Sequence, residues 1–176
     1  MQTRSLPRVR AHRSGALSAR AYACRMDTLI SILHVGTAVF LIGPMAILPM
    51  TGLRALRSGN GDQVRTLAKS TLIFSALSLF TFVFGFGAMA MADEEYNLSI
   101  TTPWILWSII LYVIAFAVNV FLVVPQMRKA ADEISAAPDG GAVAVGKPGG
   151  YGAIAGGSGV VALLLVAVVV LMICKP

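Results

Sequence analysis

Residues 151–174 read YGAIAGGSGVVALLLVAVVVLMIC and contain no charged side chain. About 20 predominantly apolar residues are enough for a helix to cross the hydrocarbon core of a bilayer. Within hydrocarbon every backbone polar group must be hydrogen bonded inside the protein, and a helix achieves this within a single segment. This stretch therefore predicts a transmembrane helix at the C-terminal end of the chain.

Three further uncharged stretches precede it and predict spans at about 28–52, 70–92 and 103–127. Together with 151–174 they predict an all-α fold, a four-transmembrane-helix bundle in a polytopic membrane protein. The composition of the 176 residues agrees, with 57% hydrophobic and only 12% charged residues. An average soluble domain has about 25% charged residues. Such a chain cannot cover a water-facing surface with polar groups, which excludes an ordinary soluble enzyme.

Residues 1–26 form a basic N-terminal arm, separate from the membrane domain at 27–176. The arm has no acidic residue, whereas the domain carries equal numbers of bases and acids, so the formal net charge of +6 belongs to the arm. Its arginines are Arg4, Arg8, Arg10, Arg13, Arg20 and Arg25. Because the basic character does not extend over the body of the protein, it is no evidence for nucleic-acid binding.

The charges of the connecting loops predict the orientation in the bacterial plasma membrane. Residues 54–69 and 128–150 carry arginine and lysine, whereas the middle connection carries the acidic run 93–95. Positively charged loops face the cytoplasm, so the two basic loops are expected there and both termini outside. The arm 1–26 conflicts with this orientation. It is either a cytoplasmic anchor or transit-type peptide, or translation begins at Met26, which the loop charges favour.

No sequence pattern supports catalysis or metal binding. Residues 141–147 match the start of a phosphate-binding loop, but Pro148 follows where a hydroxyl residue is needed, and no strand precedes the motif. Cys24 and Cys174 lie at opposite ends of the chain, which argues against a disulfide framework or a zinc site. We therefore predict that the protein is not an enzyme and holds no metal centre.

His34 is the histidine within the predicted spans, and an ionisable residue there is a functional candidate. It could be an axial ligand of haem or a ligand of copper. Alternatively, it hydrogen bonds a neighbouring helix and has a structural role. A single membrane histidine cannot supply both ligands of a bis-histidine haem within one chain.

Small residues in two of the spans predict close contacts between helices. Glycines at helical spacing let two backbones approach each other within lipid. They are Gly36 and Gly43 in the first span and Gly152, Gly156, Gly157 and Gly159 in the fourth. Two interpretations remain open, namely packing inside the bundle and contact with a helix of a partner protein.

Other side chains in the spans carry more local predictions. Trp104 and Trp107 lie at the start of the third span, where aromatic residues anchor helices at the membrane surface. Asn119 lies in the middle of the same span and is expected to face the bundle, where it finds a polar partner. Pro44 and Pro49 are expected to kink or end the first helix.

Several short motifs together resemble a known family. They are the segments 31–36 (SILHVG), 102–105 (TPWI) and 125–128 (PQMR), with the basic loop 54–69 between the first two. Over residues 27–135 the chain resembles an uncharacterised family of four-helix integral membrane proteins, distantly similar to the copper-resistance D and protoporphyrinogen-oxidase-type bundles. Within that group it is most similar to the actinobacterial respiratory supercomplex association factors.

The resemblance implies an accessory role and a set of partners. Such factors are small subunits found with the cytochrome bcc and aa3 complexes, so the implied partners are cytochrome bcc and aa3 oxidase subunits and membrane lipids. The implied function is that of a non-catalytic subunit that stabilises a respiratory supercomplex and holds no cofactor. The alternative is a haem- or copper-handling membrane protein that uses His34.

Overall fold

The computed structural model describes residues 26, 28–91, 99–136 and 150–174. All regular elements in these ranges are helices, and four of them are long and apolar enough to cross a membrane. They are Thr28–Arg57, Gly61–Met91, Pro103–Ala136 and Tyr151–Cys174. The predicted all-α four-helix class is confirmed.

Three features discussed from the sequence lie outside the described residues. They are the basic arm up to residue 25, the acidic segment 93–95 and the phosphate-loop-like segment 141–147. The predictions made for these segments therefore remain predictions.

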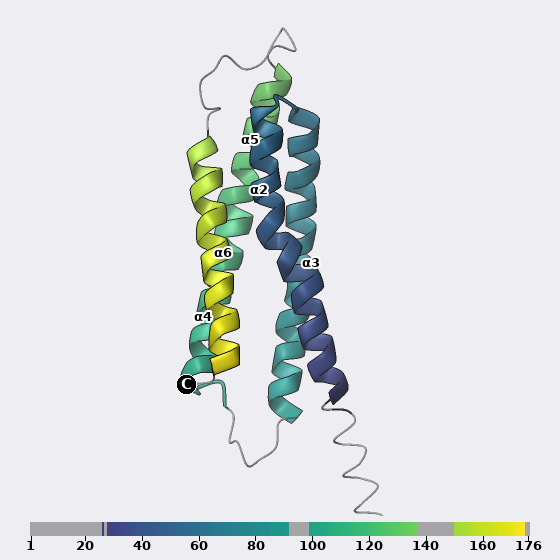
Figure 1. Cartoon of the computed structure of the whole chain (residues 1–176), viewed down its shortest axis with the longest axis vertical. Coiled ribbons are helices and arrows are strands. Elements are labelled where there is room, and N and C mark those ends of the chain that lie inside the picture. Colours follow the sequence, from purple (N-terminus) through teal and green to yellow (C-terminus); the bar gives the residue numbers. More distant parts are fainter. Residues whose placement is uncertain (1–25, 27, 92–98, 137–149, 175–176) are drawn as a thin grey trace, which may run out of the picture.

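The first long helix, Thr28–Arg57, continues through both of its prolines. It contains a π-helical segment, η1 (Ala38–Ile42), followed directly by α2 (Gly43–Arg57). Pro44 lies in the first turn of α2 and Pro49 inside it. Proline removes a backbone hydrogen bond and crowds the preceding turn, and the wider turn of a π segment makes room for it. The helix bends where it enters α2 but does not end there (Figure 1).

The third long helix repeats this combination of a π segment and a proline. Its segments are α4 (Pro103–Ala117), η3 (Val118–Val123) and α5 (Val124–Ala136). Pro125 is the second residue after η3, and the Asn119 carbonyl accepts the Val124 N–H, a bond of the π type. Because the π segment accommodates Pro125, the helix continues to Ala136, well beyond the predicted end of the span near residue 127.

The last part of α5 is amphipathic, which explains why it stays helical outside the apolar span. Met127, Ala130 and Ala131 are fully buried against the other helices. The residues between and after them, Arg128, Lys129, Asp132 and Glu133, are exposed. This alternation at helical spacing gives the segment one packed face and one charged face.

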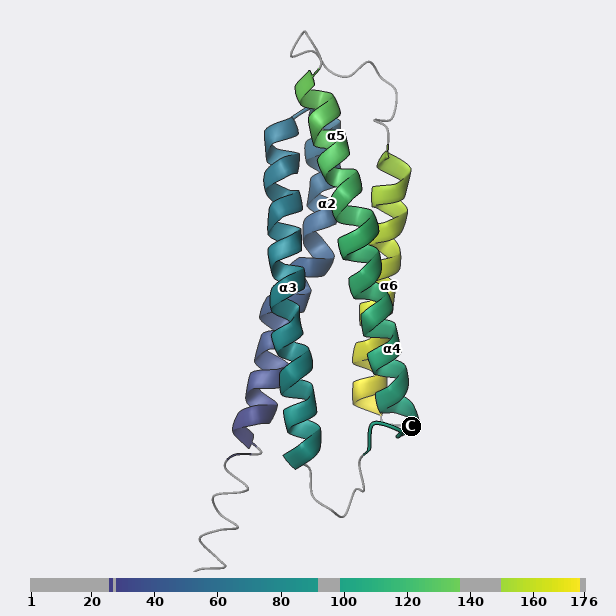
Figure 2. The ribbon, with the colours of Figure 1, turned by 180° about the vertical axis from the view of Figure 1, so that it is seen from behind.

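The four helices form an elongated bundle of antiparallel neighbours. A tight turn at Gly59, which has a positive φ of 68°, joins α2 to α3 (Gly61–Met91). The last helix is α6 (Tyr151–Cys174). At the end with this turn, α2, α3 and α5 lie together (Figure 1). Toward the other end, the first helix stays beside α3 while α4 stays beside α6, as Figure 2 also shows.

The core consists of two apolar clusters stacked along the bundle. One lies near the α2–α3 turn, where Leu56, Met127 and Ile154 are its largest members. We call this end of the bundle the basic end, because it carries the exposed residues Arg54, Arg57, Arg65, Lys69, Arg128 and Lys129. The second, central cluster contains Met45, Tyr112, Ala115, Val161 and Leu165.

Candidate functional site

A row of hydroxyl side chains runs along one face of α3. Thr71, Ser75, Ser78 and Thr81 are all buried, with exposed fractions of 3% or less. Their spacing of three or four residues places them on the same side of the helix. We call them the hydroxyl row. Sequence reasoning missed it, although this spacing of hydroxyls in an uncharged span is the signal that could have revealed it.

Side chains of the third helix bind two members of the hydroxyl row. Asn119 Nδ2 donates to Ser75 Oγ at 2.9 Å, and the Tyr112 hydroxyl lies 2.7 Å from Ser78 Oγ. Ser78 donates its own proton to the Ser75 carbonyl at 2.7 Å, so the Tyr112 hydroxyl is the donor toward Ser78. The expectation that Asn119 faces the bundle and finds a polar partner is confirmed. These two bonds tie α3 to the third helix inside the apolar part of the bundle.

Two buried polar atoms near the row have no hydrogen-bond partner within the described residues. They are Thr81 Oγ1 and Asn119 Oδ1. An unpaired buried polar atom costs about 1–3 kcal/mol relative to a bonded one. The row is therefore well bonded at Ser75 and Ser78 and incompletely bonded at Thr81, and the Asn119 side chain that binds Ser75 keeps its carbonyl oxygen unpaired within the described residues.

His34 packs from the first helix onto α3 just beyond this row. Its Nδ1 lies 2.9 Å from the Thr81 carbonyl oxygen, which can only accept, so Nδ1 carries the hydrogen. A β-carbon on Gly85 would lie 2.9 Å from His34 Cε1, closer than real Cβ contacts come. The absent side chain of Gly85 therefore provides the space for the imidazole. At Gly87 a β-carbon would lie 3.4 Å from Ile30 Cγ2, an ordinary van der Waals contact.

The hydrogen bond of His34 bears on both interpretations of this residue. It joins two helices, as the structural interpretation requires. It also matches the arrangement in which a metal-bound histidine donates its second N–H to a backbone carbonyl. Among the described residues no group of three or more His, Cys, Asp or Glu side chains could hold a metal ion. Haem can take a methionine as its second axial ligand, and Met45 on the same long helix is fully buried in the central cluster.

The candidate glycines divide into two groups. A β-carbon on Gly157 would lie 2.8 Å from Val123 Cγ2, so Gly157 packs inside the bundle. The other five would meet nothing within 4 Å, namely Gly36, Gly43, Gly152, Gly156 and Gly159. On α6, Gly152, Gly156 and Gly159 share one side of the helix with Leu163, which is 72% exposed. We call these four residues the outward glycine face of α6.

The two tryptophans lie in the first turns of α4, at the end of the bundle opposite the basic end. Trp107 is 57% exposed and Trp104 is partly buried. Amphipathic rings at the end of an apolar helix suit the membrane–water boundary.

The four apolar helices define the class of this protein as a multi-pass helical membrane protein. Buried polar groups connect its helices, and α6 presents an open glycine face. Residues 28–176 match the family described as "Predicted integral membrane protein (DUF2269)". The chain belongs to this family. The chain matches no curated protein and no solved structure.

Proposed function

We propose that this protein is a non-catalytic accessory subunit that stabilises a bacterial respiratory supercomplex of the cytochrome bcc and aa3 type by packing its transmembrane helices against those of its partners. The observation that carries the proposal is the outward glycine face of α6. Within the described residues, no atom lies within 4 Å of a β-carbon built at Gly152, Gly156 or Gly159, apart from the chain neighbours and the backbone of α6 itself.

Association of helices in lipid depends on close van der Waals packing, because lipid tails are as apolar as the helices themselves. Glycines on an outward face let a second backbone approach closely. Gly36 and Gly43 are two further open positions, both on the first helix. The choice of partner is supported by the resemblance of segments 31–36, 102–105 and 125–128 to the supercomplex association factors.

The hydrogen bonds of the buried polar groups also support a structural role. Asn119, Tyr112 and His34 each hydrogen bond another helix of the same chain. Their polar atoms thus connect helices within the bundle, as expected of a protein with a structural role.

Copurification tests this function. The chain is tagged at its C-terminus, native membranes are solubilised in a mild detergent, and the purified material is analysed on a native gel with mass spectrometry. We expect cytochrome bcc and aa3 subunits in a fixed ratio. Gly156→Leu should lower their recovery, whereas Ala76→Leu, which places the same side chain at an exposed position of α3, should not. Recovery of the chain alone, or equal recovery with both variants, would contradict the proposal.

A second function, haem or copper handling through His34, is favoured by the bond from Nδ1 to the Thr81 carbonyl. An absorption spectrum of the same purified material separates the two. A Soret band in the lone protein that disappears in His34→Gln would favour haem binding. A colourless protein that copurifies with oxidase subunits favours the accessory role.

A further inference from the structure

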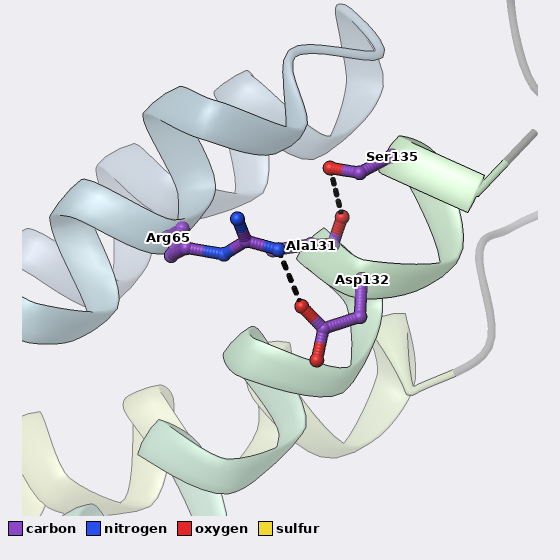
Figure 3. Close-up of polar contacts among 4 residues, drawn as sticks. All are labelled: Arg65, Ala131, Asp132 and Ser135. Carbon is purple, nitrogen blue, oxygen red and sulfur yellow. Dashed lines mark hydrogen bonds and ion pairs between the residues drawn. The ribbon is translucent and has the colours of Figure 1, made fainter.

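An ion pair joins α3 and α5 at the basic end and shows which of their residues face each other. Arg65 on α3 and Asp132 on α5 are joined by a 2.6 Å contact between a guanidinium nitrogen and a carboxylate oxygen (Figure 3). Near the start of α3, a β-carbon on Gly61 would lie 2.9 Å from the Ala131 carbonyl oxygen and 2.7 Å from Ser135 Oγ. The two helices therefore pack closely and run in opposite directions.

This register brings two further cations together. Lys69 follows Arg65 by one helical turn, and Arg128 precedes Asp132 by one turn. Because the helices are antiparallel, both steps lead the same way along the same edge, toward the middle of the bundle. Lys69 and Arg128 thus occupy neighbouring positions across the α3–α5 edge, next to the Arg65–Asp132 pair.

Neither of these two cations is neutralised within the part of the chain that the structure describes. Both are exposed, and neither makes an ion pair or a hydrogen bond there. Asp132, the nearest acid along α5, is already bound to Arg65. Two like charges on facing positions repel each other, and an anion between them would remove that cost.

The surface becomes apolar further along the same edge. Ile73 on α3 is 47% exposed, and Phe121 on the third helix is 77% exposed. Ile73 lies one helical turn beyond Lys69, and Phe121 lies two turns beyond Arg128, both toward the middle of the bundle. The edge therefore offers paired positive charge at its end and a strip of apolar surface beyond it.

We propose that Lys69 and Arg128 bind the phosphate of an anionic phospholipid, with an acyl chain along Ile73 and Phe121. The paired charges select a lipid with net negative charge, since the cationic group of a zwitterionic headgroup would be repelled. Basic clusters between helices at the end of a span are suited to such headgroups. This lipid site does not depend on the helix-docking role proposed above, and each can fail without the other.

Lipid titration of the full-length protein tests the site. The protein is purified in a mild detergent, and phosphatidylglycerol or phosphatidylcholine with the same acyl chains is added and counted by native mass spectrometry. We expect tighter binding of phosphatidylglycerol. Each Lys or Arg near an anionic headgroup contributes about 1 kcal/mol, so Lys69→Gln with Arg128→Gln should weaken binding about 30-fold.

A matched double variant controls for overall charge. Arg54→Gln with Lys129→Gln removes the same charge at the same end, from positions outside the α3–α5 edge, and should bind phosphatidylglycerol like the unaltered protein. Phe121→Ala should weaken binding with no change in charge. Circular dichroism and gel filtration verify that each variant is folded.

Three results would overturn the proposal. They are equal binding of the two lipids, equal loss in the two double variants, and displacement of phosphatidylglycerol by inorganic phosphate at matched ionic strength. The last result would show that a phosphate group suffices without the lipid.

Discussion

His34 and Gly85 are in direct contact across the first helix and α3, and a β-carbon on Gly85 would approach the His34 ring carbon Cε1 to 2.9 Å. The contact places Nδ1 within hydrogen-bond distance of the Thr81 carbonyl. The imidazole of His34 thus occupies the space that a side chain at Gly85 would fill.

This contact predicts that Gly85→Ala is destabilising. The added methyl group must displace the imidazole or separate the helices, and overpacking of this kind costs about 1–3 kcal/mol. Thermal unfolding in detergent measures the effect. Gly36→Ala is the matched control, since a β-carbon there meets nothing within 4 Å and should cause no loss. Equal stability of the two variants would show that the imidazole moves without cost.

The neighbouring glycines of α6 should respond differently to the same substitution. Gly157→Leu places a large side chain against Val123 and Leu122 and should destabilise the bundle itself. Gly156→Leu points into open space and should leave the unfolding temperature of the isolated protein unchanged. Thermal unfolding of both variants in the same detergent provides the comparison. A loss of stability in Gly156→Leu would place that glycine inside the packed bundle.

The bond between Asn119 and Ser75 predicts measurable coupling between α3 and the third helix. Interhelical hydrogen bonds in membranes contribute about 0.6 kcal/mol on average. A double-mutant cycle with Asn119→Leu and Ser75→Ala, read from unfolding equilibria in mixed micelles, should give a coupling energy of that order. Additive single effects would show that the bond contributes nothing beyond packing.

The two ends of the hydroxyl row should differ in their response to Thr→Val. Thr81 Oγ1 has no partner among the described residues, so Thr81→Val removes an unpaired buried atom and should be neutral or stabilising, by up to about 1 kcal/mol. The Thr71 hydroxyl donates to the Leu67 carbonyl at 2.8 Å, so Thr71→Val should be destabilising by comparison. Unfolding of both variants in mixed micelles measures the difference. The reverse order would mean that Thr81 has a partner in the membrane.

The sequence was sufficient for the fold class because charge is excluded from the spans. Since every backbone polar group in hydrocarbon must be hydrogen bonded, uncharged spans of this length predict helices. The ends of the helices were less predictable. Pro125 and the charges after it suggested an end near residue 127, whereas η3 accommodates the proline and the amphipathic α5 continues to Ala136.

The candidate site was less predictable than the fold. Gly156 and Gly157 are adjacent and chemically identical, so only their positions relative to Val123 tell them apart. The pairing of His34 with Gly85 joins residues that are far apart in the sequence, and its geometry depends on how two helices are placed. Asn119 could be assigned to the interior from its polarity, but its partner Ser75 could not be identified.

The two π segments have a mechanical consequence. Ile42 at the end of η1 and Val118 at the start of η3 pack against the same central cluster, so the two π segments meet near one level of the bundle. The two long helices that run in the same direction thus change course together, and the pairs of helices diverge on one side of this level (Figure 2). The bundle is therefore closed at the basic end, and beyond the π segments it consists of two helix pairs (Figure 2).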